Sequence, residues 1–334
     1  YDMTSSLVGS EMCIRDRQPR NQKPTFSKSR GIKYQLRKTF QSSNLTIILP
    51  AEKMSTKPIQ LLSPVAFRAL LWTARSDARV IPIDGSWYMP NNPRDPKADF
   101  IKERLENAKF FDLDAVIDKT SPYPHMLPTV EEFNSGVSRI GLKKTDKLIV
   151  YDKAGNFSAP RVAWTFQVFG HKHVYLLNNY LEYEKFKYPI EHFESTNPSD
   201  TSEYKSSGID REAFVTFEQF YDIVSNEDQR EKYNILDARS HDRFTGEAPE
   251  PRPGLPSGHA PGAKSLPFPK VLGESNLFLE PSVLKEVVKS TGFDPEKPTI
   301  VMCGTGVTAC ILKAALDSAG LSKSGIQVYD GSWT

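Results

Sequence analysis

Cysteine is scarce in this chain, which has three cysteines among 334 residues. So few cysteines exclude a disulfide-stabilised scaffold and are typical of a protein from a reducing compartment. The sequence also lacks an apolar run of about 18 residues, the length that a transmembrane helix requires. The chain also has almost no excess of one charge, because 43 Lys and Arg residues stand against 41 Asp and Glu residues. This balance gives no electrostatic basis for binding nucleic acid or a membrane over the whole chain.

The first 57 residues lack the patterns of a folded segment, and we expect them to be a disordered leader. Residues 1–17 do not begin with Met and look like a translated sequencing adapter, so Cys13 is set aside. Residues 17–53 contain nine Lys or Arg residues and one acid, Glu52, which is typical of a mitochondrial transit peptide. Translated upstream sequence, with initiation at Met54, is the alternative that remains open.

The length of the chain fits two domains of ordinary size. Strands and helices that alternate with short connections predict an α/β fold, in which each domain has a mostly parallel sheet with helices on both faces. We expect the first domain at 58–193, a polar linker at 194–210 and the second domain at 211–334.

In the first domain we expect strands at 80–84, 109–113, 148–152 and 174–177. Helices are expected from Ser63-Pro64, with Val65, Leu70 and Leu71 on the apolar face, from the capping box of Thr129 and Glu132, and at 159–169.

The second domain repeats the same order of elements. We expect strands at 234–237, 264–266, 299–302 and 327–329, and helices at 217–224, 282–289 and 309–319. LIVYDKAGNFSAPRVAW at 148–164 lies over TIVMCGTGVTACILKAA at 299–315, which places Asp152 at the position of Cys303. A carboxylate cannot attack sulfur, so we expect the first domain to shape the cleft without a nucleophile. Both halves also contain a strand that ends in aspartate, Asp84 and Asp237.

Cys303 opens a six-residue loop between a predicted buried strand and a helix. Gly304 and Gly306 allow this loop to curl, so that successive N–H groups converge at the mouth of the helix. A thiol with a pKa near 8.5 is about 97% protonated at neutral pH, so a nucleophilic cysteine needs stabilisation of its thiolate. Converging N–H donors and the positive end of a helix supply it. The alternative is a structural role, in which Cys303 is an inert buried cysteine at the end of a strand.

Several other kinds of site are disfavoured. A phosphate-binding P-loop would need Gly-Lys-Ser/Thr, and a Cys-x5-Arg phosphatase loop would need an arginine where Ala309 stands. No Cys-x-x-Cys pair occurs, because the next cysteine is Cys310, which we expect to be a core residue of the helix. His171, His173 and His192 lack the spacing of metal ligands. Phosphoryl transfer, dithiol exchange and metal chemistry are therefore not expected.

The run CGTGVTA at 303–309 resembles the active-site loop of the thiosulfate/3-mercaptopyruvate sulfurtransferases, the two-domain rhodanese family. The resemblance extends from about Pro58 to the last residue. It implies two tandem rhodanese-like domains and catalysis through a persulfide on Cys303, without a metal or an organic cofactor. It also implies a loop that surrounds this sulfur and the substrate, formed by Gly304, Thr305, Gly306, Val307 and Thr308.

The stretch 240–258 is polar and rich in proline, so we expect an extended surface loop rather than a helix or a strand. Taken alone, its two arginines, Arg243 and Arg252, would be solvated surface residues. The family resemblance implies instead that they hold the carboxylate and carbonyl of mercaptopyruvate. The planar guanidinium suits this task because it can donate two parallel hydrogen bonds to a carboxylate.

The segment 110–128 resembles the family segment that sends a histidine and an aspartate into the interdomain cleft. Carried over, these residues are His125 and Asp114, with Thr305 where many members have serine. A threonine hydroxyl can relay a proton as serine does, and an aspartate can orient a histidine tautomer. Whether the three residues relay a proton or only support structure stays open. Pro124 stands where an acid commonly precedes the histidine.

The choice of sulfur donor depends on the charge of the loop. In the family, members that prefer thiosulfate place Arg and Lys directly after the cysteine, whereas Gly304 and Thr305 are neutral. We therefore expect 3-mercaptopyruvate as the donor. A thiosulfate-using rhodanese and a non-catalytic rhodanese-type binding module are the alternatives.

The resemblance implies thioredoxin, cyanide or a sulfur-carrier protein as the acceptor. It also implies a role in tRNA thiolation. We expect a location in the mitochondrion, the cytoplasm or both. Thr334 follows a predicted strand closely, at a point where the family continues into a helical segment. A fragment of a longer protein is therefore one interpretation of the sequence.

Overall fold

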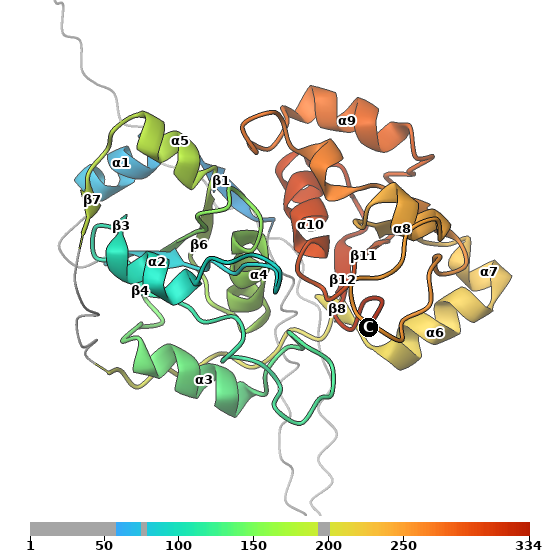
Figure 1. The fold of residues 1–334 in the computed structure, drawn as a ribbon, viewed down its shortest axis with the longest axis horizontal. Coiled ribbons are helices and arrows are strands. Elements are labelled where there is room, and N and C mark those ends of the chain that lie inside the picture. The colour runs from blue at the N-terminus through green and yellow to red at the C-terminus, as the bar shows by residue number, and fades with distance from the viewer. Residues whose placement is uncertain (1–57, 75–78, 193–200) are drawn as a thin grey trace, which may run out of the picture. The chain divides into compact units, whose positions relative to one another are not determined.

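The structure is a computed structural model that describes residues 58–74, 79–192 and 201–334 (Figure 1). The expectations for the leader at 1–57 and for most of the linker, at 193–200, lie outside the described residues. The rest of the linker, 201–210, contains neither helix nor strand. In the described part of the chain, no helix is long and apolar enough to cross a membrane.

The first half of the described chain is built on a parallel five-stranded sheet, in the order β1-β6-β5-β2-β4. Its strands are β1 (Gln60–Leu62), β2 (Val80–Asp84), β4 (Lys109–Phe110), β5 (Lys147–Tyr151) and β6 (Val174–Leu177). The helices are α1 (Pro64–Thr73), α2 (Pro96–Lys102), α3 (Val130–Arg139), α4 (Ala159–Val168) and α5 (Tyr180–Lys185). A separate antiparallel pair joins β3 (Arg104–Leu105) to β7 (Ile190–Glu191).

The second half is built on another parallel five-stranded sheet, in the order β10-β9-β11-β12-β8. Its strands are β8 (Phe214–Val215), β9 (Asn234–Asp237), β10 (Ala263–Ser265), β11 (Thr299–Met302) and β12 (Ile326–Tyr329). Its helices are α6 (Phe217–Ser225), α7 (Glu227–Arg230), α8 (His241–Thr245), the 3-10 helix η1 (Phe268–Val271), α9 (Pro281–Lys289) and α10 (Ala309–Ser318).

Helices cover both faces of each sheet (Figure 1). In the second half, Ile300 of β11 packs in one buried cluster with Phe220 of α6, while the next residue, Val301, packs in another with Leu284 of α9. Successive strand residues point to opposite faces, so each strand contributes to both clusters. Strands β1, β6, β5, β2 and β4 correspond in position to β8, β12, β11, β9 and β10. The predicted α/β class, with two mostly parallel sheets covered on both faces, is confirmed.

The two halves share one core through helices α4 and α10. These helices contact each other, and residues of both belong to the largest hydrophobic cluster. In α4 nine of ten residues are buried, and in α10 eight of ten. A helix that is buried all round lies inside a protein rather than on its surface. The start of each helix, where the Asp152 and Cys303 loops lead into it, is therefore held within the protein.

Most local signals in the sequence are confirmed by the structure. Ser63 caps α1 by accepting a hydrogen bond from the N–H of Ala66 at 3.1 Å. Thr129 and Glu132 form the predicted capping box at the start of α3. Such a box satisfies backbone donors that the first turn of a helix leaves without partners.

Three local predictions are wrong. The strand expected at 109–113 ends at Phe110, because Asp112 accepts hydrogen bonds from the N–H groups of Asp114 and Ala115 and turns the chain. The stretch 240–258 contains a short helix, α8, which ends where Gly246 adopts a left-handed φ of 89°. Val65 is exposed, and the buried residues of α1 are Pro64 and Phe67.

The aspartates that end β2 and β9 are both fully buried but have different partners. Asp237 forms an ion pair with Arg239, with 2.6 Å between Oδ2 and Nη2. Ser86 stands at the corresponding place in the first half, and its N–H donates to Oδ1 of Asp84 at 2.9 Å. Oδ2 of Asp84 has no hydrogen-bond partner among the described residues. Burial therefore raises the pKa of Asp84 from 3.8 to about 6.

We predict that Asp84→Asn makes stability less dependent on pH. Because the pKa of Asp84 is higher in the folded state, the folded protein retains a proton between about pH 4 and 6 that the unfolded chain has lost. Stability from this group is present at low pH and falls as the pH rises through that window. The unfolding free energy of Asp84→Asn relative to wild type should therefore rise by about 1–3 kcal/mol between about pH 4 and 7. Urea unfolding at both pH values measures it.

The matched control for this prediction is Asp237→Asn. This change removes one of the two carboxylates that pair with the buried Arg239, so it should lower the unfolding free energy by about 3–5 kcal/mol at neutral pH. Parallel pH profiles for wild type and Asp84→Asn would contradict the assigned pKa of Asp84.

Candidate active site

Cys303 lies in the loop between β11 and α10, and it is 2% exposed. Its N–H donates to Oγ of Ser332 at 3.1 Å, and its carbonyl accepts from the N–H of Trp333 at 3.1 Å. Ser332 also donates to the carbonyl of Tyr329 at the end of β12. The segment after β12 therefore fixes the main chain of Cys303. Nothing in the sequence pointed to Ser332 or Trp333, because these contacts bridge about thirty residues without a local pattern.

The equivalent loop of the first half holds a carboxylate. Oδ2 of Asp152 accepts hydrogen bonds from the N–H groups of Phe157, Ser158 and Ala159 at 2.8, 2.9 and 2.8 Å, and Oδ1 accepts one from Ala154 at 3.0 Å. Burial raises the pKa of Asp152, while these hydrogen bonds oppose that change. A loop of this length before a helix thus binds an anion through main-chain donors.

The alignment identifies the counterparts of these donors near Cys303. Phe157, Ser158 and Ala159 correspond to Thr308, Ala309 and Cys310. The N–H of Cys310 donates to the carbonyl of Val307 at 3.2 Å. Thr308 and Ala309 are therefore the counterparts, in the sequence alignment, of the two donors Phe157 and Ser158.

The two glycines of the loop have different structural roles. Gly306 adopts a left-handed φ of 74°, and a Cβ there would lie 2.6 Å from Nη1 of Arg161 and 2.8 Å from the carbonyl oxygen of Asp330. Gly304 does not adopt this conformation, but a Cβ on it would lie 3.3 Å from Nη2 of Arg243. Gly306 thus provides the curl of the loop, and Gly304 leaves room for an arginine beside Cys303.

Thr305, His125 and Asp114 form a hydrogen-bonded row. Nδ1 of His125 lies 3.2 Å from Oγ1 of Thr305, and Nε2 lies 2.9 Å from Oδ1 of Asp114. With Nε2 protonated towards the carboxylate, Nδ1 is free to accept the threonine proton. The hydrogen bond from His125 lowers the pKa of Asp114. The structure thus brings together residues from both halves, and the arrangement is competent to move a proton.

A tryptophan that the sequence did not indicate holds this row in place. The indole N–H of Trp87 donates to Oδ2 of Asp114 at 3.0 Å, and its ring packs edge-on against His125 with the centroids 4.8 Å apart. His125 itself is 3% exposed and has a left-handed φ of 61°. Such a backbone conformation in a non-glycine residue costs on the order of 1–3 kcal/mol and persists only where the surroundings enforce it.

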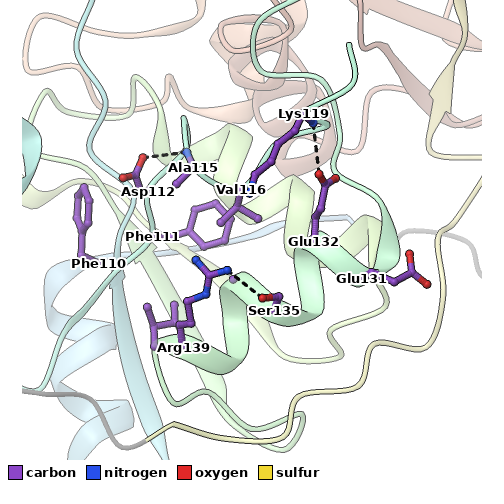
Figure 2. A pocket seen from close by; sticks show the side chains of 12 residues that line it. Phe110, Phe111, Asp112, Ala115, Val116, Lys119, Glu131, Glu132, Ser135 and Arg139 are labelled. Carbon is purple, nitrogen blue, oxygen red and sulfur yellow. Dashed lines mark hydrogen bonds between the residues drawn. The ribbon is translucent and has the colours of Figure 1, made fainter.

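The segment that carries Asp114 contacts helix α3 through a hydrogen bond and through apolar packing. Asp112 bonds to the N–H of Ala115, the N–H of Lys119 donates to Glu132, and a pocket of about 330 Å³ lies between the segment and the helix (Figure 2). Val116 packs against Gly136, where a Cβ would lie 2.7 Å from a methyl group of Val116. The lining of this pocket does not include Asp114, His125 or the Cys303 loop.

The two predicted arginines have different environments. Nε of Arg243 lies 3.2 Å from Oε1 of Glu250, and Nη2 bonds to the other oxygen of the same carboxylate. Glu250 also pairs with Arg239 at 2.7 Å, so it anchors both arginines. Nη1 of Arg252 is buried and has no hydrogen-bond partner within 58–74, 79–192 and 201–334. Burial lowers the pKa of Arg252, and the charge of Asp114 opposes that shift.

Cys310 has the environment of a core residue. It is 1% exposed, its Sγ donates to the carbonyl of Gly306 at 3.3 Å, and burial raises its pKa to about 12. It is therefore a thiol rather than a thiolate at neutral pH. In the described ranges, no three His, Cys, Asp or Glu side chains are grouped so as to hold a metal ion.

A protein with two such sheets and a cysteine loop that leads into a buried helix belongs to the rhodanese class of folds. A family model described as a rhodanese-like domain matches residues 217–334. The chain is 43% identical over 286 residues to thiosulfate sulfurtransferase TUM1 of Saccharomyces cerevisiae, which covers 82% of this chain and 93% of that protein. The crystal structure of Tum1 from the same yeast gives a TM-score of 0.78 over 83% of this chain and 94% of that chain.

A second relative is thiosulfate/3-mercaptopyruvate sulfurtransferase 1, mitochondrial, of Arabidopsis thaliana. It is 39% identical over 267 residues, which are 75% of this chain and 70% of that protein. The chain therefore belongs to the thiosulfate/3-mercaptopyruvate sulfurtransferase family, as its sequence predicted. It is a sulfurtransferase enzyme with two tandem rhodanese-like domains.

We predict that Gly306→Ala impairs the enzyme far more than Gly320→Ala does. Gly320 also has a left-handed φ, 60°, but nothing lies within 4 Å of a Cβ built on it. Both changes carry the cost of a left-handed alanine, roughly 1–2 kcal/mol. Only Gly306→Ala adds a clash with Arg161 and Asp330, which should displace the loop and lower kcat/KM by about 10²-fold. Steady-state kinetics and thermal unfolding of both variants measure the difference, and equal losses would refute it.

Proposed function

We propose that this sulfurtransferase takes sulfur from 3-mercaptopyruvate, carries it as a persulfide on Cys303 and delivers it to a thiol or cyanide acceptor. The Cys303 thiolate attacks the donor sulfur, a sulfur–sulfur bond forms, and the sulfur–carbon bond breaks. The electron pair of the broken bond remains on carbon as the enolate of pyruvate. That carbon takes up the proton that the donor thiol gives up, so pyruvate leaves and the persulfide anion remains. This is covalent catalysis in two half-reactions.

The observation that carries this proposal is the environment of Arg252. A buried guanidinium nitrogen without a partner is costly, and a bound carboxylate would satisfy it. Its charge acts on Asp114, which is hydrogen-bonded to His125, and His125 reaches Thr305 of the cysteine loop. Arg243 borders Gly304, next to Cys303, where it can stabilise the negative charge that develops on the keto oxygen.

The stabilisation of the cysteine anion has a precedent within the same chain. In the first half, three consecutive N–H groups hold one oxygen of Asp152. The corresponding N–H groups of Thr308 and Ala309 support a thiolate and a persulfide anion at Cys303. Gly306, which has no Cβ, allows the turn of the loop. Val307 is 2% exposed and packs in the core beneath this loop.

The row of Thr305, His125 and Asp114 supports the proton transfer that the chemistry requires. The donor thiol loses a proton and the enolate carbon gains one. A hydroxyl that is bonded to a neutral imidazole, which is itself bonded to a carboxylate, can accept and return that proton. No step in this sequence needs a metal or an organic cofactor.

Thiosulfate is the second candidate donor. The yeast relative is named a thiosulfate sulfurtransferase, and the Arabidopsis relative is named for both donors. Against thiosulfate stands the neutral pair Gly304 and Thr305, because a dianion would gain from cations directly after the cysteine. Transfer to thioredoxin or a sulfur-carrier protein, a role in tRNA thiolation, and a mitochondrial or cytoplasmic location are further proposals. The word mitochondrial in the name of the Arabidopsis protein supports only the location.

We predict that kcat/KM for 3-mercaptopyruvate exceeds that for thiosulfate by at least about tenfold, and that Cys303→Ser abolishes turnover of both. Steady-state assays with cyanide and with a small thiol as acceptor measure both values. Mass spectrometry should find one added sulfur on the peptide that contains Cys303 after donor alone. Cys310→Ala is the matched control and should retain turnover. Activity in Cys303→Ser would overturn the proposal, and a preference for thiosulfate would favour the second candidate.

We further predict that Arg252→Gln raises KM for 3-mercaptopyruvate by about 10- to 100-fold, the equivalent of one charge-assisted hydrogen bond. Arg211→Gln, in which the removed arginine is exposed and lies over Phe214, is the control for loss of a positive charge. Equal KM values for the two variants would exclude Arg252 as the carboxylate partner.

A further inference from the structure

Arg161 joins three segments that each carry part of the site. It lies in the first turn of α4, is 1% exposed and belongs to the first half of the chain. Its Nη1 lies 3.3 Å from the carbonyl oxygen of Gly306 in the cysteine loop, and its Nη2 donates to the carbonyl oxygen of His125. Nη1 also lies 2.7 Å from Oδ1 of Asp330.

Asp330, in the second half, also bonds to the main chain of the first half. It follows β12, and its Oδ2 accepts from the N–H of Leu127 at 2.8 Å. Leu127 is two residues after His125, and Ser332, which bonds to the N–H of Cys303, is two residues after Asp330. The ion pair is therefore linked to the main chain on both sides of the hydrogen bond between His125 and Thr305.

The same junction occurs a second time in the molecule, without charge. Register in the two sheets makes Asn178 the counterpart of Asp330, because Val174 and Ile326 hold equivalent places beside β5 and β11. The amide of Asn156 donates to Oδ1 of Asn178 and to the carbonyl of Asn276, both at 2.8 Å. Oδ1 of Asn178 also accepts from the N–H of Phe278, two residues after Asn276.

The bonds to Asn178 and to the carbonyl of Asn276 repeat those to Asp330 and to the carbonyl of His125, but their donor, Asn156, lies in the loop before α4 and not at the position that corresponds to Arg161. Asn276 corresponds to His125, and both have a left-handed φ, of 54° and 61°. At the position of Arg161 itself, helix α10 has Leu312, which is fully buried. The architecture therefore closes this junction with neutral side chains on one side and with an ion pair on the side of the cysteine loop.

Stability alone is a poor reason for the ion pair. A buried ion pair often contributes no more stability than apolar residues of the same volume, because both charges lose their hydration. What the planar guanidinium adds is direction, since its fork can bond to several acceptors at fixed angles. Here the acceptors are the carbonyl of Gly306, which follows Thr305, and the carbonyl of His125, the middle member of the row.

We propose that Arg161 and Asp330 are positioning residues of the sulfurtransferase reaction, whose ion pair holds the cysteine loop and the His125 segment in register. Neither residue touches the substrate. Their effect on rate is exerted through the geometry of Cys303, Thr305 and His125, so this inference rests on the function proposed above for those residues.

The test replaces the ion pair with two neutral amide side chains, the kind of group that closes the other junction. In the double variant Arg161→Gln with Asp330→Asn, we expect kcat for 3-mercaptopyruvate to fall by about 10²-fold, the effect of a displacement of about 1 Å, while KM changes by less than about threefold. The matched control is Lys313→Met, which removes another buried cation, from α10, that pairs with Asp317 at 2.7 Å. Kinetics are normalised to folded protein by circular dichroism.

A second comparison separates positioning from a general loss of structure. In a Thr305→Val background the double change should lower kcat by less than about threefold, because the row that it aligns is already broken. Should the double variant fail to fold, Arg161→Lys decides, since it keeps the charge but loses the fork. We expect it to lower kcat by about tenfold with an unchanged melting temperature.

Equal kcat in Arg161→Lys and wild type, or equal losses in the double variant and Lys313→Met, would overturn this inference. Failure of the proposed function would look different, because wild type itself would then not turn over 3-mercaptopyruvate. In that case the pH dependence of Cys303 alkylation by iodoacetamide still reports on the loop. An unchanged alkylation profile in the double variant would then overturn the positioning role.

Discussion

The first N–H groups of a helix that begins inside the protein must find an acceptor, and this requirement shapes both loops of the enzyme. Helix starts leave several N–H donors without partners, and a buried donor left unsatisfied costs about 1–3 kcal/mol. At α4 one oxygen of Asp152 accepts hydrogen bonds from the N–H of the first helical residue, Ala159, and from the N–H groups of the two residues before it. At α10 the same position is occupied by Cys303, whose sulfur is a good acceptor only as an anion. The anion proposed at Cys303 would take the place that the Asp152 carboxylate has in the first half.

The duplication separates the fold from the chemistry. Both halves have the same strand order, a strand that ends in a buried aspartate and a loop that leads into a buried helix. They differ where the halves meet. One junction is closed by Asn156 and Asn178, the other by Arg161 and Asp330. The charges are thus concentrated on the side of Cys303, although the first half supplies Arg161, together with His125 and Asp114.

The sequence was sufficient to predict the elements that depend on local signals. The capping box at Thr129 and the strand–loop–helix unit around Cys303 follow from residues only a few positions apart. Val65 was misplaced because apolar spacing identifies a face of a helix but not its rotation against the sheet, which Phe67 determines. Helix α8 was missed because prolines further along the stretch outweighed its five residues.

The supporting residues of the site could not be predicted in this way. Trp87, Glu250 and Ser332 act through hydrogen bonds to residues that are distant in the sequence or carry no motif of their own. No sequence pattern indicates the role of Arg161 either, because its partners lie in the other half of the fold or in a separate loop. The resemblance named Cys303, His125 and Asp114, but only the fold brings the residues that orient them into contact.

The pairing of charges around the site bears on which donor suits it. Arg239 and Arg243 are paired with the two carboxylates of Asp237 and Glu250. Arg161 is neutralised by Asp330, so three guanidinium groups are already balanced by three carboxylates. Among the residues that the structure describes, Arg252 keeps a buried N–H without a partner, and Asp114 offsets part of its charge. A site with about one uncommitted positive charge matches a monoanion such as a keto acid. A dianion would bring a second charge into a desolvated place, where it would stay unpaired at a cost of several kcal/mol, on the order of the penalty for one buried ion.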